Sequence, residues 1–277
     1  MHNSYHSESA KITAISWQTN NVKLFRFEFE RKVFGHSLKI KPGQFMELSL
    51  PGFGEAPFAP CNATGSGCIE LCIRSTGRLT EKLHAMKIGD KVGLRGPYGN
   101  GWPVVADNKL PLAKQNLLII VGGLGFVPLR TLILGKEKFL GKESKVQIFY
   151  GARSPDDMLF RHEYGTWKKQ NIEVVLTIDK ESTNWRGNIG LVTSLFDKVV
   201  LNENSTAFLC GPPVMYRSVL EKLLERKFEE DEIFLSLERR MHCGIGVCQH
   251  CAVGPYYTCK HGPIFSWTQL KNIPSAI

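Results

Sequence analysis

Four cysteines lie close together near the C-terminus, in the stretch "MHCGIGVCQHCAVGPYYTCKHG". Cys243, Cys248, Cys251 and Cys259 follow the order C-x4-C-x2-C-x7-C, and the first three match the plant-type spacing of [2Fe–2S] proteins. The glycines between them let the backbone curl around an inorganic core and direct amide N–H groups at sulfur. We predict that these four thiols bind a [2Fe–2S] cluster.

Two other uses of the loop stay open. A structural zinc site usually pairs two C-x2-C knuckles, and the loop has one, Cys248 to Cys251. A disulfide is less favoured, because the start "MHNSYHSESAKITAI" shows no secretory signal and we expect a reducing, cytoplasmic location. Cys61, Cys68 and Cys72 are expected to be small buried residues, with a second metal site as the weaker alternative.

A glycine-rich turn is the second chemical signal, in "LLIIVGGLGFVPLRTL". A buried strand runs into Gly122, Gly123 and Gly125, and Pro128 stands where the first turn of a helix tolerates a missing N–H. Such a turn lets phosphates approach the backbone and a helix N-terminus. The third glycine of G-x-G-x-x-G is absent, so a turn without a ligand stays open.

The segment "TAFLCGPPVMYRSVL" repeats this strand, turn and helix pattern. Cys210 and Gly211 end a buried strand, and ligands bind at the carboxyl ends of strands in open α/β sheets. Taken alone, Cys210 fits a small buried residue as well as a reactive one.

A fourth signal is "LCIRSTGRLTEKL". Arg74 and Thr80, separated by a glycine turn, offer a guanidinium and a hydroxyl beside backbone donors, which suits a pyrophosphate. A single arginine on a strand more often faces water.

Hydrophobic patterning predicts the elements that position these residues. From residue 12 to about 105, short alternating runs separated by Gly, Pro and Asn predict an antiparallel β-barrel. Continuous apolar runs then alternate with amphipathic segments, as in a parallel α/β sheet covered by helices. A small C-terminal cysteine segment follows. The predicted domains are residues 8–110, 111–230 and 231–277.

Composition limits the partners. The 277 residues are 43% hydrophobic and 22% charged, as in a globular protein. The net charge of +9 is spread along the chain, so no nucleic-acid partner is expected. The longest apolar run is broken by glycines, Pro128 and Arg130, so no direct membrane insertion is expected either.

Together these motifs resemble the ferredoxin-NADP reductase superfamily. "KPGQFMEL", "GEAPF", "IRSTGRLTEKL", "GDKVGLRGPYGNGW", "YGARSPDDMLF" and "SLERRMHCGIGVCQHC" resemble one branch of it. That branch holds the electron-transfer subunit of dihydroorotate dehydrogenase, the gamma subunit of sulfhydrogenases and the corresponding subunit of anaerobic sulfite reductase.

The resemblance implies three redox groups: FAD in the barrel, NAD(P)H as substrate on the α/β domain, and the [2Fe–2S] cluster. Cys210 would be catalytic, bordering the nicotinamide. Residues implied for FAD are Pro57, Phe58, Ala59, Pro60, Cys61, Asn62, Arg74, Ser75, Gly77, Arg78, Leu79 and Thr80. Residues implied for the nicotinamide cofactor are Gly122, Gly123, Gly125, Pro128, Arg153, Gly211, Pro212 and Met215.

One segment departs from the superfamily pattern. The flavin motif usually has an Arg two residues before a Tyr and then a Ser, where this chain has Ala56, Phe58 and Ala59. Phe58 can still pack on the flavin ring, but the tuning of the flavin is expected to differ.

Cofactor choice depends on the segment "YGARSPDDMLFRHE". Arg153 and Arg161 would favour the 2′-phosphate of NADPH, whereas Asp156 and Asp157 would favour NADH. We lean to NADPH.

The implied function is that of an electron-transfer enzyme. A hydride delivers two electrons, an iron–sulfur cluster accepts one, and a flavin can divide the pair. The partner would be the catalytic subunit of a heteromeric complex, such as a hydrogenase, sulfhydrogenase or sulfite reductase. Two alternatives stay open: a reductase that acts alone on a ferredoxin or free flavin, and a zinc-stabilised nucleotide-binding module without redox activity.

Overall fold

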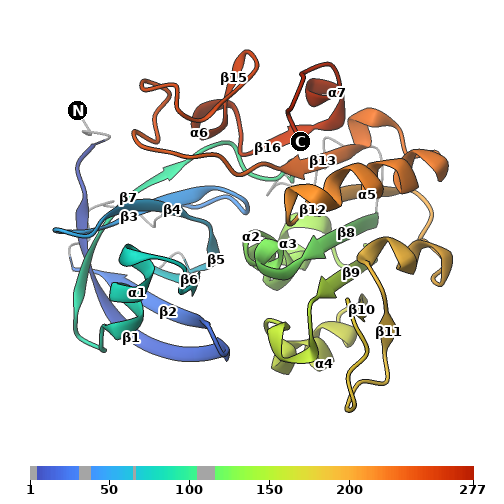
Figure 1. Ribbon diagram of the computed structural model, residues 1–277, viewed down its shortest axis with the longest axis horizontal. Helices are drawn as coiled ribbons and strands as arrows, with labels where there is room; N and C mark the ends of the chain where they lie inside the picture. The colour runs from blue at the N-terminus through green and yellow to red at the C-terminus, as the bar shows by residue number, and fades with distance from the viewer. Residues whose placement is uncertain (1–4, 31–38, 65–66, 105–115) are drawn as a thin grey trace. The chain divides into compact units, whose positions relative to one another are not determined.

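The computed structural model describes residues 5–30, 39–64, 67–104 and 116–277 (Figure 1). Contacts divide the chain into two compact units. The barrel unit comprises residues 1–102, 127–131 and 238–263, and the α/β unit comprises residues 103–126, 132–237 and 264–277. The predicted domain boundary between residues 110 and 111 lies outside the described residues.

The barrel unit is built on a seven-stranded antiparallel sheet of order β4-β3-β7-β1-β2-β6-β5. Strands β4 and β5 stand at opposite ends of this order, yet only Ala59 separates them along the chain. The sheet must therefore curl until its two ends adjoin, as the predicted barrel requires. The elements are β1 (Glu8–Thr19), β2 (Val22–Phe29), β3 (Phe45–Leu50), β4 (Gly54–Phe58), β5 (Pro60–Thr64), β6 (Cys68–Arg74), helix α1 (Arg78–Ala85) and β7 (Lys91–Tyr98).

Alternation explains why these runs form a barrel with one apolar face. In β2, Phe25 and Phe27 are fully buried, whereas Arg26 and Glu28, which alternate with them, are exposed. The same period of two places Met46 and Leu48 of β3, with residues from the other strands, in a single core.

The α/β unit holds a second seven-stranded sheet, of order β11-β10-β9-β8-β12-β13-β16, in which only β16 runs antiparallel. Its central strands are the predicted apolar runs, and β8 and β12 are almost wholly buried. The strands are β8 (Asn116–Gly122), β9 (Val146–Ala152), β10 (Ile172–Ile178), β11 (Asn188–Ile189), β12 (Ser205–Cys210), β13 (Ile233–Ser236) and β16 (Ile264–Ser266). The helices are α3 (Lys136–Leu140), α4 (Tyr164–Lys168), α5 (Pro213–Glu225) and α7 (Trp267–Leu270). Helix α2 (Val127–Leu134) is divided by the grouping, since residues 127–131 belong to the barrel unit and the remainder to the α/β unit.

Contacts divide the C-terminal stretch between the two units. Strands β13 and β16 complete the second sheet, while residues 238–263, which include all four loop cysteines, group with the barrel unit. This cysteine segment contains β14 (Ala252–Val253), β15 (Tyr256–Tyr257) and α6 (Thr258–His261). Among the described residues, no helix has the length and hydropathy needed to span a bilayer.

Candidate iron–sulfur and cofactor sites

The cysteine segment turns its backbone amides toward sulfur. The Sγ atom of Cys243 accepts from the N–H groups of Ile245, Val247 and Cys248 at 3.5, 3.3 and 3.4 Å. The Gly246 N–H donates to Cys259 Sγ at 3.1 Å. Positive φ angles at the loop glycines, Gly246 among them, make this curled path available.

The four thiols form two pairs. Cys251 Sγ lies 3.3 Å from Cys259 Sγ, and the Cys243 and Cys248 side chains hydrogen-bond to each other. In the described part of the chain, no three or more His, Cys, Asp or Glu side chains are arranged for a single metal ion. The two pairs can together supply four thiolate ligands to an iron–sulfur cluster.

The loop thiols differ in how readily they ionise. Burial works to raise the pKa of Cys243, but the amides of Cys248, Ile245 and Val247 outweigh it and lower that pKa. Backbone amides also lower the pKa of Cys248, whereas burial raises that of Cys259 to about 12. Because thiolates are the metal-binding form, a metal held by Cys259 would have to displace the proton of this thiol.

The predicted flavin segment crosses from β4 to β5. Phe58 packs, half-buried, against the barrel core, and Cys61 is fully buried. The Cys61 Sγ–H donates to the Glu70 carbonyl at 3.4 Å, and burial raises the pKa of this thiol to about 12. Cys61 is therefore a protonated thiol of low reactivity.

Arg74 ends β6 beside the start of helix α1. Its Nε is buried and has no hydrogen-bond partner among the described residues. The Thr80 hydroxyl accepts from the N–H groups of Thr76 and Gly77 at 2.9 and 3.0 Å, while Arg78 donates to the Gly52 carbonyl. Arg74 and the remaining amides of the first helical turn thus suit a pyrophosphate.

Two glycine-rich turns meet at the carboxyl ends of β8 and β12. The strands pair in parallel, with Cys210 opposite Val121. A Cβ on Gly125 would lie 2.1 Å from the Cys210 carbonyl oxygen, and one on Gly211 would lie 3.0 Å from the backbone nitrogen of Gly122. The turn glycines are thus required by packing between the turns. Cys210 itself is buried.

The arginines proposed to select the nicotinamide lie on the surface after β9. Arg153 pairs with Asp157 at 3.1 Å, and Arg161 lies 3.8 Å from Asp156. Both guanidinium groups are well exposed, so these ion pairs are weak and a ligand phosphate can compete for them.

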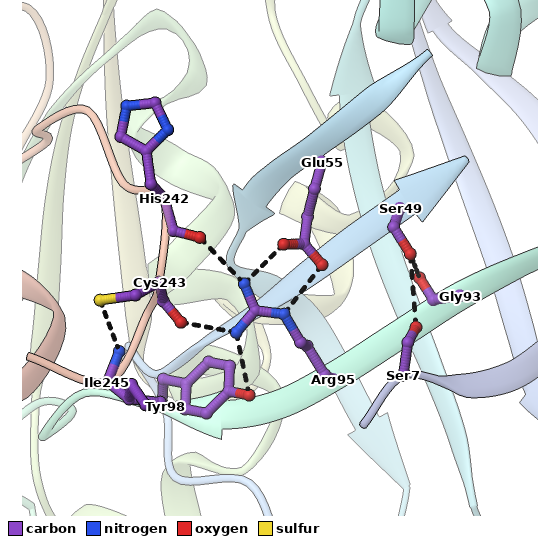
Figure 2. A network of polar contacts seen from close by, with 9 residues as sticks. All are labelled: Ser7, Ser49, Glu55, Gly93, Arg95, Tyr98, His242, Cys243 and Ile245. Carbon is purple, nitrogen blue, oxygen red and sulfur yellow. Dashed lines mark hydrogen bonds and ion pairs between the residues drawn. The ribbon is translucent and has the colours of Figure 1, made fainter. Parts of the chain in front are cut away.

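Sequence reasoning missed the polar residues that hold these turns. The Tyr216 hydroxyl accepts from the Gly211 N–H and donates to the Ser236 carbonyl. Sequence reasoning also missed Arg95, on β7, which donates to the Cys243 carbonyl of the cysteine segment and pairs with Glu55 (Figure 2). An isolated arginine between glycines in an alternating strand gives no signal that it is buried.

Comparison with known proteins agrees with this geometry. Three family models match consecutive parts of the chain: an oxidoreductase FAD-binding domain at 9–102, an oxidoreductase NAD-binding domain at 119–221, and the iron-sulfur cluster binding domain of dihydroorotate dehydrogenase B at 238–271. The chain is 40% identical over 260 residues to sulfhydrogenase 2 subunit gamma of Pyrococcus furiosus, covering 89% of this chain and 88% of that protein. The chain belongs to the electron-transfer-subunit branch of the ferredoxin-NADP reductase superfamily.

A second member of this branch is a probable dihydroorotate dehydrogenase B electron transfer subunit of Pyrococcus abyssi. It is 36% identical, over 92% of this chain and 89% of that protein. The solved structure of an NADH-dependent reduced ferredoxin-NADP oxidoreductase has the same fold, with a TM-score of 0.74 at 22% identity, covering 100% of this chain and 95% of that chain. The predicted superfamily, fold class and oxidoreductase class are confirmed, with FAD, a nicotinamide dinucleotide and an iron–sulfur cluster as the cofactor set.

Proposed function

We propose that this chain takes a hydride from NAD(P)H onto FAD and passes single electrons through a [2Fe–2S] cluster to a catalytic partner subunit. The observation that carries the proposal is the grouping of the cysteine segment with the barrel unit, although it follows the α/β sheet along the chain. The residues proposed to bind the flavin and those proposed to bind the cluster thereby belong to one unit.

FAD, when bound, accepts two electrons together and releases them one at a time. The chain's own residues supply binding and placement. Arg74 would pair with the pyrophosphate, Phe58 would pack on the flavin ring, and the four loop thiols would hold the cluster. Such placement requires no general acid or base from the protein.

The [2Fe–2S] type of the cluster is supported by the two thiol pairs. Cys243 pairs with Cys248, and Cys251 with Cys259. Amide N–H groups directed at Cys243 and Cys259 would stabilise negative charge on sulfur.

NADPH is the proposed reductant, supported by the two exposed arginines after β9. Arg153→Ala should raise KM for NADPH much more than KM for NADH, because only NADPH has the 2′-phosphate. Exposed Arg186→Ala is the control and should change neither value. Equal changes in both values for Arg153→Ala would remove the case for NADPH.

A catalytic partner is supported by the relatives, which are named as gamma or electron-transfer subunits. A hydrogenase, sulfhydrogenase or sulfite reductase subunit is the class of partner we propose. The reducing cytoplasm is the proposed location, in keeping with eight free cysteines.

Anaerobic purification of the native protein tests this function. The chain should carry FAD with about two irons and two acid-labile sulfides, and a redox subunit should co-purify. Stoichiometric zinc without flavin would instead support the nucleotide-binding module. A chain that purifies without a partner and reduces ferredoxin as fast as NADPH reduces its flavin would support the alternative of a reductase that acts alone.

A further inference from the structure

We propose that Arg95, held by Glu55, is the positioning residue that fixes the cysteine segment to the flavin barrel and sets the reduction potential of its cluster. The inference rests on the proposed function, since it assumes that the cluster is present. It assigns a role to an ion pair between the buried Arg95 side chain and the partly exposed Glu55 carboxylate.

The Arg95 guanidinium joins the barrel to the start of the cysteine segment (Figure 2). Its Nε and Nη2 donate to the two Glu55 carboxylate oxygens at 2.8 and 2.5 Å. Nη1 donates to the Cys243 carbonyl at 2.6 Å, and Nη2 also reaches the His242 carbonyl at 3.2 Å. One planar group thus holds a β4 carboxylate and two carbonyls that flank the first predicted ligand.

Burial makes this arrangement specific. The Arg95 side chain is only 4% exposed, and Nη1 also donates to the Tyr98 hydroxyl at 3.2 Å. The Glu55 side chain remains 30% exposed, so water screens the ion pair and the pair alone is poor evidence of a stability role. Lysine has the same charge but lacks the fork of N–H donors that can hold a carboxylate and carbonyls together.

The backbone of the loop lies directly over these charges. Gly244 adopts φ +74°, and a Cβ there would lie 3.3 Å from both Arg95 Nη1 and Glu47 Oε1. Glu47 stands opposite Arg95 in the β3–β7 pairing and is 1% exposed. The residue after Cys243 is therefore packed on a buried cation and a buried carboxyl group, with little room for a side chain.

The turn after β7 holds the other end of the segment. The Asn100 backbone N–H donates to the Gly262 carbonyl at 2.6 Å, and its side-chain amide donates to the His261 carbonyl at 3.0 Å. A Cβ on Gly99 would lie 2.6 Å from Pro263 Cδ. Arg95 and Asn100 together fix both ends of the loop to one strand and its turn.

Arg95 and Glu55 carry opposite charges, so removing one or the other should shift the reduction potential of the cluster in opposite directions. A cluster gains one negative charge on reduction, so a nearby cation stabilises the reduced form and a nearby carboxylate destabilises it. Loss of the Arg95 charge should make the reduction potential more negative. Loss of the Glu55 charge should make it more positive. Loosening of the loop alone would not give opposite signs.

The test compares Arg95→Gln, Arg95→Lys and Glu55→Gln in the full chain. The matched control is Lys91→Met. Lys91 lies on β7, as Arg95 does, and the change breaks its surface ion pair with Glu30. For each variant we would measure the iron content and the FAD content. The reduced cluster would be examined by EPR, and its reduction potential would be determined by redox titration. We expect both Arg95 variants to lose about 10- to 100-fold in iron affinity, as is typical when an outer partner of a metal site is removed. FAD content should stay at the wild-type level, and the control should match wild type throughout.

If Arg95→Gln loses FAD along with iron, its barrel has been disturbed and the result says nothing specific about the cluster. Glu55→Gln then decides the outcome, because it keeps Arg95 and the contacts of Arg95 to both carbonyls. A Glu55→Gln potential and EPR spectrum identical to wild type would overturn the inference. Shifts of the same sign in Glu55→Gln and Arg95→Gln would also overturn it. Both results leave the proposed function intact, whereas a wild-type chain without iron would overturn the two together.

Discussion

At Cys243 three backbone amides point at one sulfur, whereas at Cys61 the thiol donates to a carbonyl inside the barrel. The first arrangement favours thiolate, and burial keeps the second thiol protonated. Cysteine identity alone therefore does not decide how readily a thiol ionises. Cys243 accepts three backbone N–H groups, whereas Cys61 accepts from the Arg130 guanidinium at 3.8 Å and its pKa is dominated by its burial.

Replacing one ligand should separate the two halves of the electron path. Cys251→Ser should lose the cluster, because a serine oxygen is a poorer ligand than thiolate for this soft-ligand site. FAD and its reduction by NADPH, followed by stopped flow, should stay near wild type, while reduction of the partner collapses. The half-buried Cys68→Ser on β6 is the control and should keep its iron. Loss of flavin reduction in a Cys251→Ser chain that retains FAD would contradict the order of transfer.

Arg74 is the second residue with a measurable role. Arg74→Ala should weaken FAD binding by roughly 10- to 150-fold, because a charge-assisted hydrogen bond is worth about 1.5–3 kcal/mol. The exposed β2 variant Arg26→Ala removes the same charge elsewhere on the barrel and should retain FAD fully. Equilibrium dialysis of both variants gives the comparison, and equal retention would exclude Arg74 as a pyrophosphate ligand.

At the scale of elements, the ends of β8 and β12 show why two turns need glycine. The turns contact each other so closely that a Cβ on Gly125 would overlap the Cys210 carbonyl. The close contact aligns both turns at one edge of the α/β sheet. The position of one turn relative to the other therefore depends on the parallel register of β8 and β12 as well as on the turn residues.

Gly125→Ala should displace these two turns. Overpacking of this kind typically costs about 1–3 kcal/mol, so we expect a lower thermal midpoint and a higher KM for NAD(P)H with FAD unaffected. The control is Gly165→Ala in helix α4, where a Cβ meets nothing within 4 Å. If Gly125→Ala and Gly165→Ala had the same thermal midpoint and KM, packing between the turns would not explain the glycine.

Periodicity predicted the elements well because each is a local pattern. The run "LLIIVGG" has the continuous apolar character of a strand buried on both faces, and it forms most of β8. The contact between Arg95 and the Cys243 carbonyl joins residues 148 positions apart. No local pattern encodes such a pair, so the attachment of the cysteine loop to the barrel could not be predicted from periodicity.

At the scale of the whole molecule, chain order and packing differ. The cysteine segment comes after the α/β sheet in sequence, but residues 238–263 pack with the barrel, and β16 then returns the chain to the sheet. The residues proposed for FAD and for the cluster therefore belong to one unit. The residues proposed to select the nicotinamide cofactor belong to the other.

Rapid-freeze EPR of the anaerobic wild-type chain mixed with NADPH follows the order of electron transfer. We expect flavin absorbance to fall first and the signal of a reduced [2Fe–2S] cluster to appear afterwards in the same chain. Cys251→Ser should show the first change without the second. Complete flavin reduction in the wild type with no cluster signal, or a cluster signal that precedes flavin reduction, would contradict transfer from nicotinamide through flavin to iron–sulfur.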